Sequence, residues 1–277
     1  MNEPKAPPSR FVEKIWKREF VVVALTAMAM AVLLVTALLH RQLRLAEVRN
    51  EITPIAVFPD FASIEQISVK KQMFFDFMEL YIDRQNETVA QTRTRLLELS
   101  TAVSGGQPLS PDEHAELLAV AGRYHLELEE MEESELLLEL LKRVDTIPKP
   151  LALAQAATES AWGTSRFALE GNNLFGQWCY DDGCGLVPGR RSADASHEVR
   201  AFESIDAAVR AYFMNLNTHH QYRNFRELRF EMRNREGDLD AEALAWGLDG
   251  YSERGEKYVD EVQTIIQQNN LVENYGG

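Results

Sequence analysis

The sequence is short of cysteine and of positive charge. Two cysteines in 277 residues exclude a disulfide-dense scaffold and a zinc module built on four thiolates. Lysine and arginine number 29 against 43 acidic residues, which gives a formal net charge of -14. Phosphate binding needs a basic surface, so this balance argues against nucleic acid as a partner.

Several catalytic motifs are also missing. The chain has no Walker sequence, no G-x-S-x-G nucleophile motif and no zinc-protease helix. His219 and His220 are adjacent, so on a helix their side chains point in different directions and make a poor ligand pair. We therefore expect neither a metal site nor a cofactor.

One long uncharged run stands near the N-terminus. Residues 20–39 read FVVVALTAMAMAVLLVTALL, which is long enough as a helix to span roughly 30 Å of hydrocarbon. A cleaved signal peptide is the alternative, but the run ends in LLHRQLRL, which has no small-residue cleavage site. Lysine and arginine are more numerous before the run than after it, which places residues 1–19 in the cytoplasm and the rest outside.

The exported part divides into three segments by its pattern. Residues 40–59 form a proline-containing linker, and residues 60–147 form a helical accessory segment. In that segment, apolar residues recur at three- and four-residue intervals from Met73 to Tyr81 and indicate one buried helix face. Ser110, followed by proline and then by Glu113, is typical of a capping box.

The remaining residues, 148–277, are predicted to be the catalytic domain. An alanine-rich helix starts at Pro150 and is followed by a loop rich in glycine and asparagine. A β-hairpin through the turn at 180–183 and a short strand at 198–202 come next. Ser204 is expected to cap another helix. Additional helices are expected at 241–248 and 256–268.

Cys179 and Cys184 are five residues apart across a predicted turn. Outside the cytoplasm a disulfide between them is favoured over a metal site, since no second ligand pair accompanies them. Two free thiols are the alternative.

Glu159 is the best candidate for a catalytic acid. It lies near the end of an otherwise apolar helix, between Ala157 and Ala161 and beside Trp162. Desolvation disfavours the carboxylate, so such a group keeps its proton near neutral pH, as a general acid must. A surface or capping glutamate is the alternative that the helix alone allows.

The surrounding run, residues 154–178, reads AQAATESAWGTSRFALEGNNLFGQW. It resembles the glucosaminidase domain of glycoside hydrolase family 73, and within that family the Bax-type bacterial branch. The family has an A-x-E-S-x-W-G helix and then N-N-x-F-G. The matching positions here are Glu159, Ser160, Trp162, Gly163, Asn172, Asn173, Phe175 and Gly176.

The resemblance implies a mainly α, lysozyme-like helical core with a small β-hairpin lobe. It implies hydrolysis of bacterial peptidoglycan at the β-1,4 bond on the reducing side of N-acetylglucosamine. Peptidoglycan strands are then the partner, and the enzyme is held at the inner membrane by its N-terminal helix, with the catalytic domain in the periplasm. The sequence leaves the oligomeric state unknown.

The resemblance also implies further site residues. Relatives with a second catalytic acid carry it in a segment like HEVRAFES, where Glu198 fits and Glu203 is the weaker candidate. Glu198 either activates a water or, if the sugar's 2-acetamido group attacks, only orients substrate. The predicted substrate contacts are Trp162, Asn173, Phe175, Trp178, Tyr251 and Tyr258, although core packing is the alternative for Phe175, Trp178 and Tyr258.

Two other functions compete with this one. A lytic transglycosylase on a similar fold needs one acid/base group and leaves anhydromuramyl ends. A membrane-anchored protein that binds peptidoglycan without cutting it is the non-enzymatic alternative.

Overall fold

The computed structural model describes residues 58–127, 131–189, 196–235 and 238–276, which belong to one compact unit. No helix in these ranges is long and apolar enough to cross a membrane. The predicted membrane helix, residues 20–39, lies outside the described residues. So do the predicted cytoplasmic segment and nearly all of the linker.

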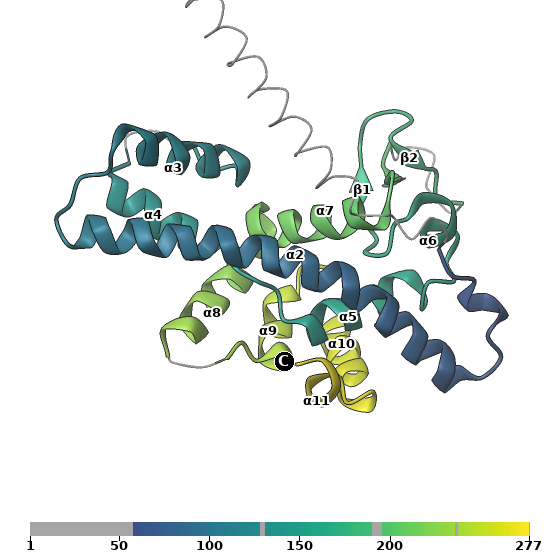
Figure 1. Cartoon of the computed structure of the whole chain (residues 1–277). Coiled ribbons are helices and arrows are strands. Elements are labelled where there is room, and N and C mark those ends of the chain that lie inside the picture. The colour runs from purple at the N-terminus through teal and green to yellow at the C-terminus, as the bar shows by residue number, and fades with distance from the viewer. Residues whose placement is uncertain (1–57, 128–130, 190–195, 236–237, 277) are drawn as a thin grey trace, which may run out of the picture. The chain divides into compact units, whose positions relative to one another are not determined.

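The described unit is mainly helical, as predicted (Figure 1). Its first helices are α2 (Ile67–Ser104), α3 (Pro111–Arg123), α4 (Glu133–Arg143), α5 (Lys149–Ser160) and α6 (Arg166–Gly171). The later ones are α7 (Ile205–Thr218), α8 (Arg223–Asn234), α9 (Ala241–Ala245), α10 (Glu256–Gln268) and α11 (Leu271–Tyr275). Short 3-10 helices are η1 (Phe61–Ser63), η2 (His220–Tyr222) and η3 (Trp246–Leu248).

The long helix α2 packs against α4, α5 and α7. It buries Phe74, Phe75, Phe77 and Met78, whereas Met73 is 46% exposed, so the prediction was wrong about that one residue. Met73 and Phe77 are four residues apart, but their burial differs because only part of the predicted face meets neighbouring helices.

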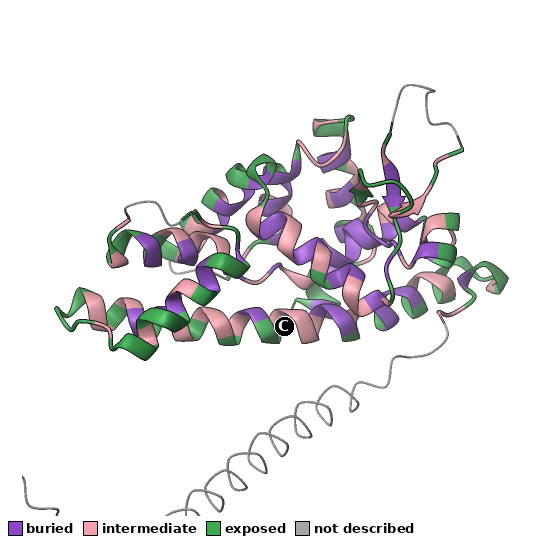
Figure 2. Ribbon diagram, turned by 90° about the horizontal axis from the view of Figure 1, so that it is seen from above, coloured by how far each residue is buried: buried purple, intermediate pink, exposed green. Residues whose placement is uncertain are grey.

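The alanine-rich helix α5 lies at the centre of the packing. Every residue from Pro150 to Ala157 is buried, and α2, α9, α10 and α11 all contact this helix. Small side chains let neighbouring backbones approach, which explains the alanine content. Figure 2 shows buried residues gathered where helices face one another, with exposed residues along the outer sides.

A buried charge cluster holds the connection between α4 and α5. Asp145 is 1% exposed and pairs with Arg93 of α2 at 3.4 Å and Arg233 of α8 at 3.0 Å. Arg229, 0% exposed, donates to main-chain carbonyls at the end of α4. These contacts join the predicted accessory segment to the predicted catalytic domain.

The predicted hairpin is wrong. Strands β1 (Trp178–Cys179) and β2 (Gly185–Leu186) do not pair with each other; both pair antiparallel with β3 (Glu198–Arg200), in the order β1-β3-β2. The absence of a side chain at Gly185 permits this, because a Cβ there would lie 2.0 Å from the carbonyl oxygen of Val199. The lobe is therefore a small three-stranded sheet.

Candidate active site

Glu159 lies in the last turn of α5, which the motif's serine brings to an end. The Ser160 hydroxyl donates to the Ala156 carbonyl oxygen at 2.6 Å and accepts from the Gly163 amide at 2.8 Å. Ala161 and Trp162 then adopt left-handed backbone angles, with φ of 50° and 60°. This closure satisfies polar groups at the helix end and turns the chain sharply away from it.

That turn carries Trp162 against α2. Its ring meets Phe74 and Phe75 edge to face, with centroids 6.0 and 5.2 Å apart, and Lys71 lies 4.6 Å from its centroid. The prediction made Trp162 both the group that desolvates Glu159 and a sugar contact. In the structure its ring packs on α2 and stays partly exposed, so its contact with a sugar remains a prediction.

Different groups surround the Glu159 carboxyl, which is neither fully buried nor fully exposed. Burial raises the pKa of Glu159, a hydrogen bond from Tyr258 and the charge of Arg254 oppose that rise, and Glu261 adds to it. The partial negative charge at the C-terminal end of α5 acts in the same direction as burial. The predicted raised pKa is therefore confirmed in direction.

Gly176, the last residue of the N-N-x-F-G segment, lies directly against this carboxyl. It has a φ of 64°, and a Cβ there would lie 2.8 Å from Glu159 Oε2. The motif therefore needs glycine for a left-handed turn and for close approach of the backbone to the acid.

Tyrosines from three elements form the other side of the site. The Tyr258 ring is fully buried and stacks on Tyr251, with centroids 5.4 Å apart. Tyr251 donates its hydroxyl hydrogen to the Phe175 carbonyl oxygen at 2.7 Å, and its ring lies 5.7 Å from that of Tyr222. Burial raises the pKa of Tyr251 and Tyr258, so both hydroxyls remain hydrogen-bond donors.

Two predicted substrate contacts serve the loop itself. Asn173 is 1% exposed and makes four hydrogen bonds to backbone groups of residues 175, 177 and 200. Phe175 is 1% exposed and stacks on Tyr212 at 3.9 Å between centroids, so neither face is open to a sugar ring. Both residues position Gly176 rather than offer a binding surface.

Trp178 is the predicted aromatic contact that stays open. It is 51% exposed and its ring stacks on His197, with centroids 4.2 Å apart. A large exposed indole held by a neighbour has a geometry suited to stacking on a sugar ring.

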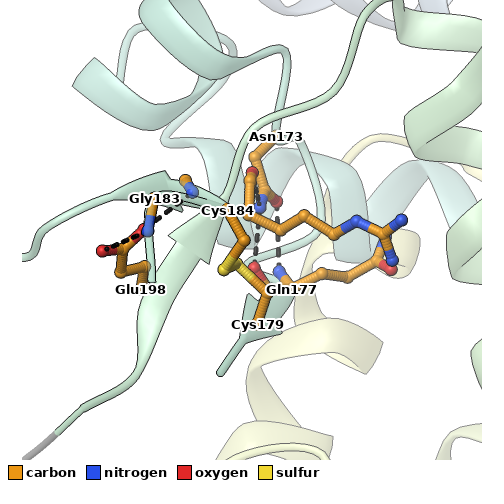
Figure 3. The surroundings of a disulfide bond; sticks show 8 residues. Asn173, Gln177, Cys179, Gly183, Cys184 and Glu198 are labelled. Carbon is orange, nitrogen blue, oxygen red and sulfur yellow. Dashed lines mark hydrogen bonds between the residues drawn. A yellow bond between two sulfur atoms is a disulfide. The ribbon is translucent and has the colours of Figure 1, made fainter. Parts of the chain in front are cut away.

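The β-lobe is closed by the predicted disulfide, Cys179–Cys184 (Figure 3). Glu198 also fastens this loop: its Oε2 accepts from the Gly185 amide at 2.8 Å and its Oε1 from the Gly183 amide at 3.3 Å. It is 7% exposed, so its carboxylate is committed to the backbone of the lobe. Glu203 is exposed and precedes the N-cap Ser204.

Cys179, Cys184 and Glu198 form the candidate metal cluster within the described residues, with ligand atoms within 4.8 Å of one another. Because the two sulfurs are bonded to each other, they have no thiolate to offer.

Sequence reasoning missed three residues of this site. Gln155, which donates to the Tyr258 hydroxyl at 3.0 Å, was not singled out, although it lies four positions before Glu159 on one helix and therefore on the same face. Gly176 was known only as a motif position, and nothing in the sequence indicates that Tyr222 approaches Tyr251, because that contact joins distant segments.

Comparisons with known proteins identify the family of the chain. Residues 134–271 match the glucosaminidase family model, described as mannosyl-glycoprotein endo-beta-N-acetylglucosaminidase. The chain is 33% identical over 211 residues to "Protein bax" of Escherichia coli (strain K12), covering 76% of this chain and 74% of that protein. The matched range of the family model includes Glu159, Glu198, Tyr222, Tyr251 and Tyr258.

A solved structure, the catalytic domain of the autolysin Auto from Listeria monocytogenes, shares 15% identity with a TM-score of 0.39, over 82% of this chain and 95% of that one. The extent and identity of the match to the Escherichia coli protein, together with the family model, show that the chain belongs to the glucosaminidase family.

Proposed function

We propose that the chain is a peptidoglycan hydrolase, an endo-β-N-acetylglucosaminidase that cuts the β-1,4 bond on the reducing side of N-acetylglucosamine. The observation that carries the proposal is the Glu159 carboxyl, whose pKa burial raises and which a tyrosine hydroxyl and a glycine backbone hold in place. A neutral carboxyl that keeps some access to solvent can protonate a glycosidic oxygen. The family membership supports the reaction class.

The hydrogen bonds that Glu198 accepts affect which group can attack the anomeric carbon. A base that activates water needs a free carboxylate, and both oxygens of Glu198 accept backbone N–H groups. This favours attack on the anomeric carbon by the sugar's own 2-acetamido oxygen, after Glu159 has given its proton to the leaving oxygen. Glu159, now ionised, would then take a proton from the water that opens the cyclic intermediate.

The stereochemistry of the product separates these routes. Attack by the acetamido group followed by water retains the anomeric configuration, whereas a single attack by water inverts it. Proton NMR of the fresh reducing end should therefore show retention. Inversion would assign the activation of water to Glu198.

The assignment of Glu159 is tested by Glu159→Gln in a peptidoglycan zymogram, with circular dichroism as the check on folding. We expect loss of cleavage with an unchanged spectrum. Glu170→Gln is the matched control, since Glu170 is exposed on α6 and pairs with Arg166 at 3.7 Å. Full activity of Glu159→Gln would overturn the proposal.

The products of digested sacculi identify the bond that is cut. Mass spectrometry should find N-acetylglucosamine at the new reducing ends. Anhydromuramyl ends would instead identify a lytic transglycosylase, and tight binding without released fragments would identify a non-catalytic protein.

The proposed location is the periplasmic face of the inner membrane, with residues 20–39 as a single-pass anchor. The apolar run and the excess of basic residues before it support this orientation. A disulfide is also expected in an oxidising compartment. Protease added to spheroplasts should digest the C-terminal unit, and protection of that unit would refute the orientation.

A further inference from the structure

A buried chain of hydrogen bonds runs from Tyr212 through Gln155 and Tyr258 to Glu159. Gln155, one turn earlier on α5, is 0% exposed and both ends of its amide are engaged. Its Oε1 accepts from the Tyr212 hydroxyl at 2.6 Å, and its Nε2 donates to the Tyr258 hydroxyl oxygen at 3.0 Å. Tyr258 in turn shares a hydrogen bond with Glu159.

The direction of this chain is fixed by its far end. Within the described residues, the Tyr212 hydroxyl makes its hydrogen bond to Gln155, and an amide oxygen can only accept. The other end of the amide is therefore the NH₂ group, which can only donate, so Tyr258 receives a hydrogen there. The single hydrogen of the Tyr258 hydroxyl is left to point at Glu159.

The opposite amide orientation satisfies fewer groups. It would leave the Tyr212 hydrogen without an acceptor and would draw the Tyr258 hydrogen toward Gln155. A lone pair of Tyr258 would then face Glu159, so the neutral Glu159 carboxyl would turn its own hydrogen toward Tyr258. Buried polar groups left unpaired in this way cost free energy, which favours the observed orientation.

The donor state of Tyr258 has a consequence for the acid. A carboxyl oxygen that accepts the Tyr258 hydrogen cannot also aim a proton at Tyr258. We propose that Gln155 is a positioning residue that locks the Tyr258 hydroxyl as a donor and so reserves the other Glu159 oxygen for the proton given to the sugar. This inference rests on the proposed general-acid role of Glu159.

Other charged and titratable groups near Glu159 do not duplicate this role. Arg254, in the segment before α10, and Glu261, on α10, act on Glu159 through their charges. Burial, and to a smaller extent the charge of Glu159, in turn raises the pKa of Tyr212, Tyr222 and Tyr251. Arg254 and Glu261 also form an ion pair with each other. Gln155 carries no charge, so its influence on the acid is one of hydrogen-bond direction.

The test compares two substitutions in the full-length chain by steady-state kinetics across pH. Gln155→Met keeps the length of the side chain and removes both hydrogen-bonding ends. We expect kcat to fall about 10- to 100-fold with little change in KM, because the Glu159 proton is then free to turn to Tyr258.

Gln155→Glu supplies a rescue that depends on pH. A protonated carboxyl has one donor and one acceptor, like the amide, whereas an ionised carboxylate only accepts and would draw the Tyr258 hydrogen toward itself. Activity should approach that of the wild type at acidic pH and fall steeply as the introduced carboxyl ionises. Gln155→Met should show no such rescue.

A structural role alone predicts something else. Both variants would then lower the melting temperature, and their ratio of activities would stay constant with pH, which would overturn the inference. If Gln155→Met does not fold, Tyr212→Phe is the second variant: it preserves the stack on Phe175 and frees the amide to rotate, so kcat should again fall while KM holds. Wild-type kcat in Tyr212→Phe would also count against the inference.

The two levels of proposal fail separately. If Glu159→Gln is active, Glu159 is not the general acid, whatever the role of Gln155. If Glu159→Gln is inactive but Gln155→Met has the kcat and pH profile of the wild type, only the positioning role of Gln155 is refuted.

Discussion

The Glu159 carboxyl is subject to opposing influences, and its burial is the strongest of them. A group whose pKa is higher in the folded than in the unfolded chain stabilises the fold only while it is protonated. Its contribution is fully present below the unfolded pKa of about 4.3 and is lost as pH rises through the folded value. The proposed acid therefore weakens the fold at neutral pH.

Glu159→Gln should accordingly be more stable than the wild type at neutral pH. The amide keeps the shape of the side chain and an acceptor for Tyr258, and it has no proton to gain on folding at a pH where an unfolded glutamate is ionised. Thermal unfolding at a series of pH values should show a gain that vanishes below about pH 4. The exposed Glu170→Gln should show no such dependence, and a Glu159→Gln gain that is independent of pH would contradict the account.

Gly176→Ala tests how closely the backbone must approach the acid. The added Cβ would lie 2.8 Å from Glu159 Oε2, and the left-handed angle adds strain of about 1–2 kcal/mol. We expect loss of most activity with the fold retained, measured by zymogram and circular dichroism.

Gly183→Ala is the matched control for that substitution. Its φ of 78° gives similar strain, but nothing lies within 4 Å of the added Cβ. It should lose comparable stability and keep its activity. Equal activities in the two variants would show that approach to Glu159 is not what Gly176 provides.

At the scale of helices and strands, the ion pairs of the buried Asp145 are expected to contribute strongly to stability. Asp145 lies in the connection between α4 and α5, where it pairs with Arg93 of α2 and Arg233 of α8. Asp145→Asn leaves two arginines short of their counter-charge, and breaking a buried pair typically costs about 3–5 kcal/mol. Denaturant unfolding should show a loss of that order.

Asp206→Asn is the control at the same scale. Asp206 pairs with Arg210 at 2.7 Å and Arg84 at 3.5 Å near the surface, where an ion pair contributes about 0–1 kcal/mol. Similar losses in the two variants would contradict the importance assigned to burial.

At the scale of helices and strands, part of the fold could be predicted from the sequence. Local patterns predicted α10 at 256–268, and the capping box of α3 forms with both hydrogen bonds between Ser110 and Glu113. Those signals depend on residues a few positions apart. The hairpin prediction failed because β3, a dozen residues later, pairs with both strands, and no local signal reports such a partner.

The candidate site divides in the same way. Glu159 and its motif were found from the sequence, since their residues are consecutive. The contact of Glu159 with Tyr258 depends on α5 packing against α10, about a hundred residues away, as does the hydrogen bond from Gln155. The sequence therefore pointed to Trp162, a neighbour along the chain, and gave no sign that Tyr258 and Gly176 lie against the acid.

At the scale of the whole described unit, the predicted boundary at residue 148 crosses a continuous core. Phe74 and Phe75 of α2 pack on Trp162, and Phe61 lies so close to Gly163 that a Cβ there would meet its ring at 2.6 Å. The buried residues of both segments form one hydrophobic cluster. Residues 60–147 thus cover the helix that carries the proposed acid.

A fragment of residues 148–277 should therefore fail to fold, whereas residues 58–277 should fold and unfold cooperatively. Without α2, the apolar faces of α5 and α7 lose their cover, and Arg233 loses Asp145. Circular dichroism with thermal unfolding compares the two fragments directly. Cooperative unfolding of the shorter fragment would make residues 60–147 an accessory that docks on an independent domain. Its failure to fold would mean that residues before 148 belong to the unit that holds Glu159 in place.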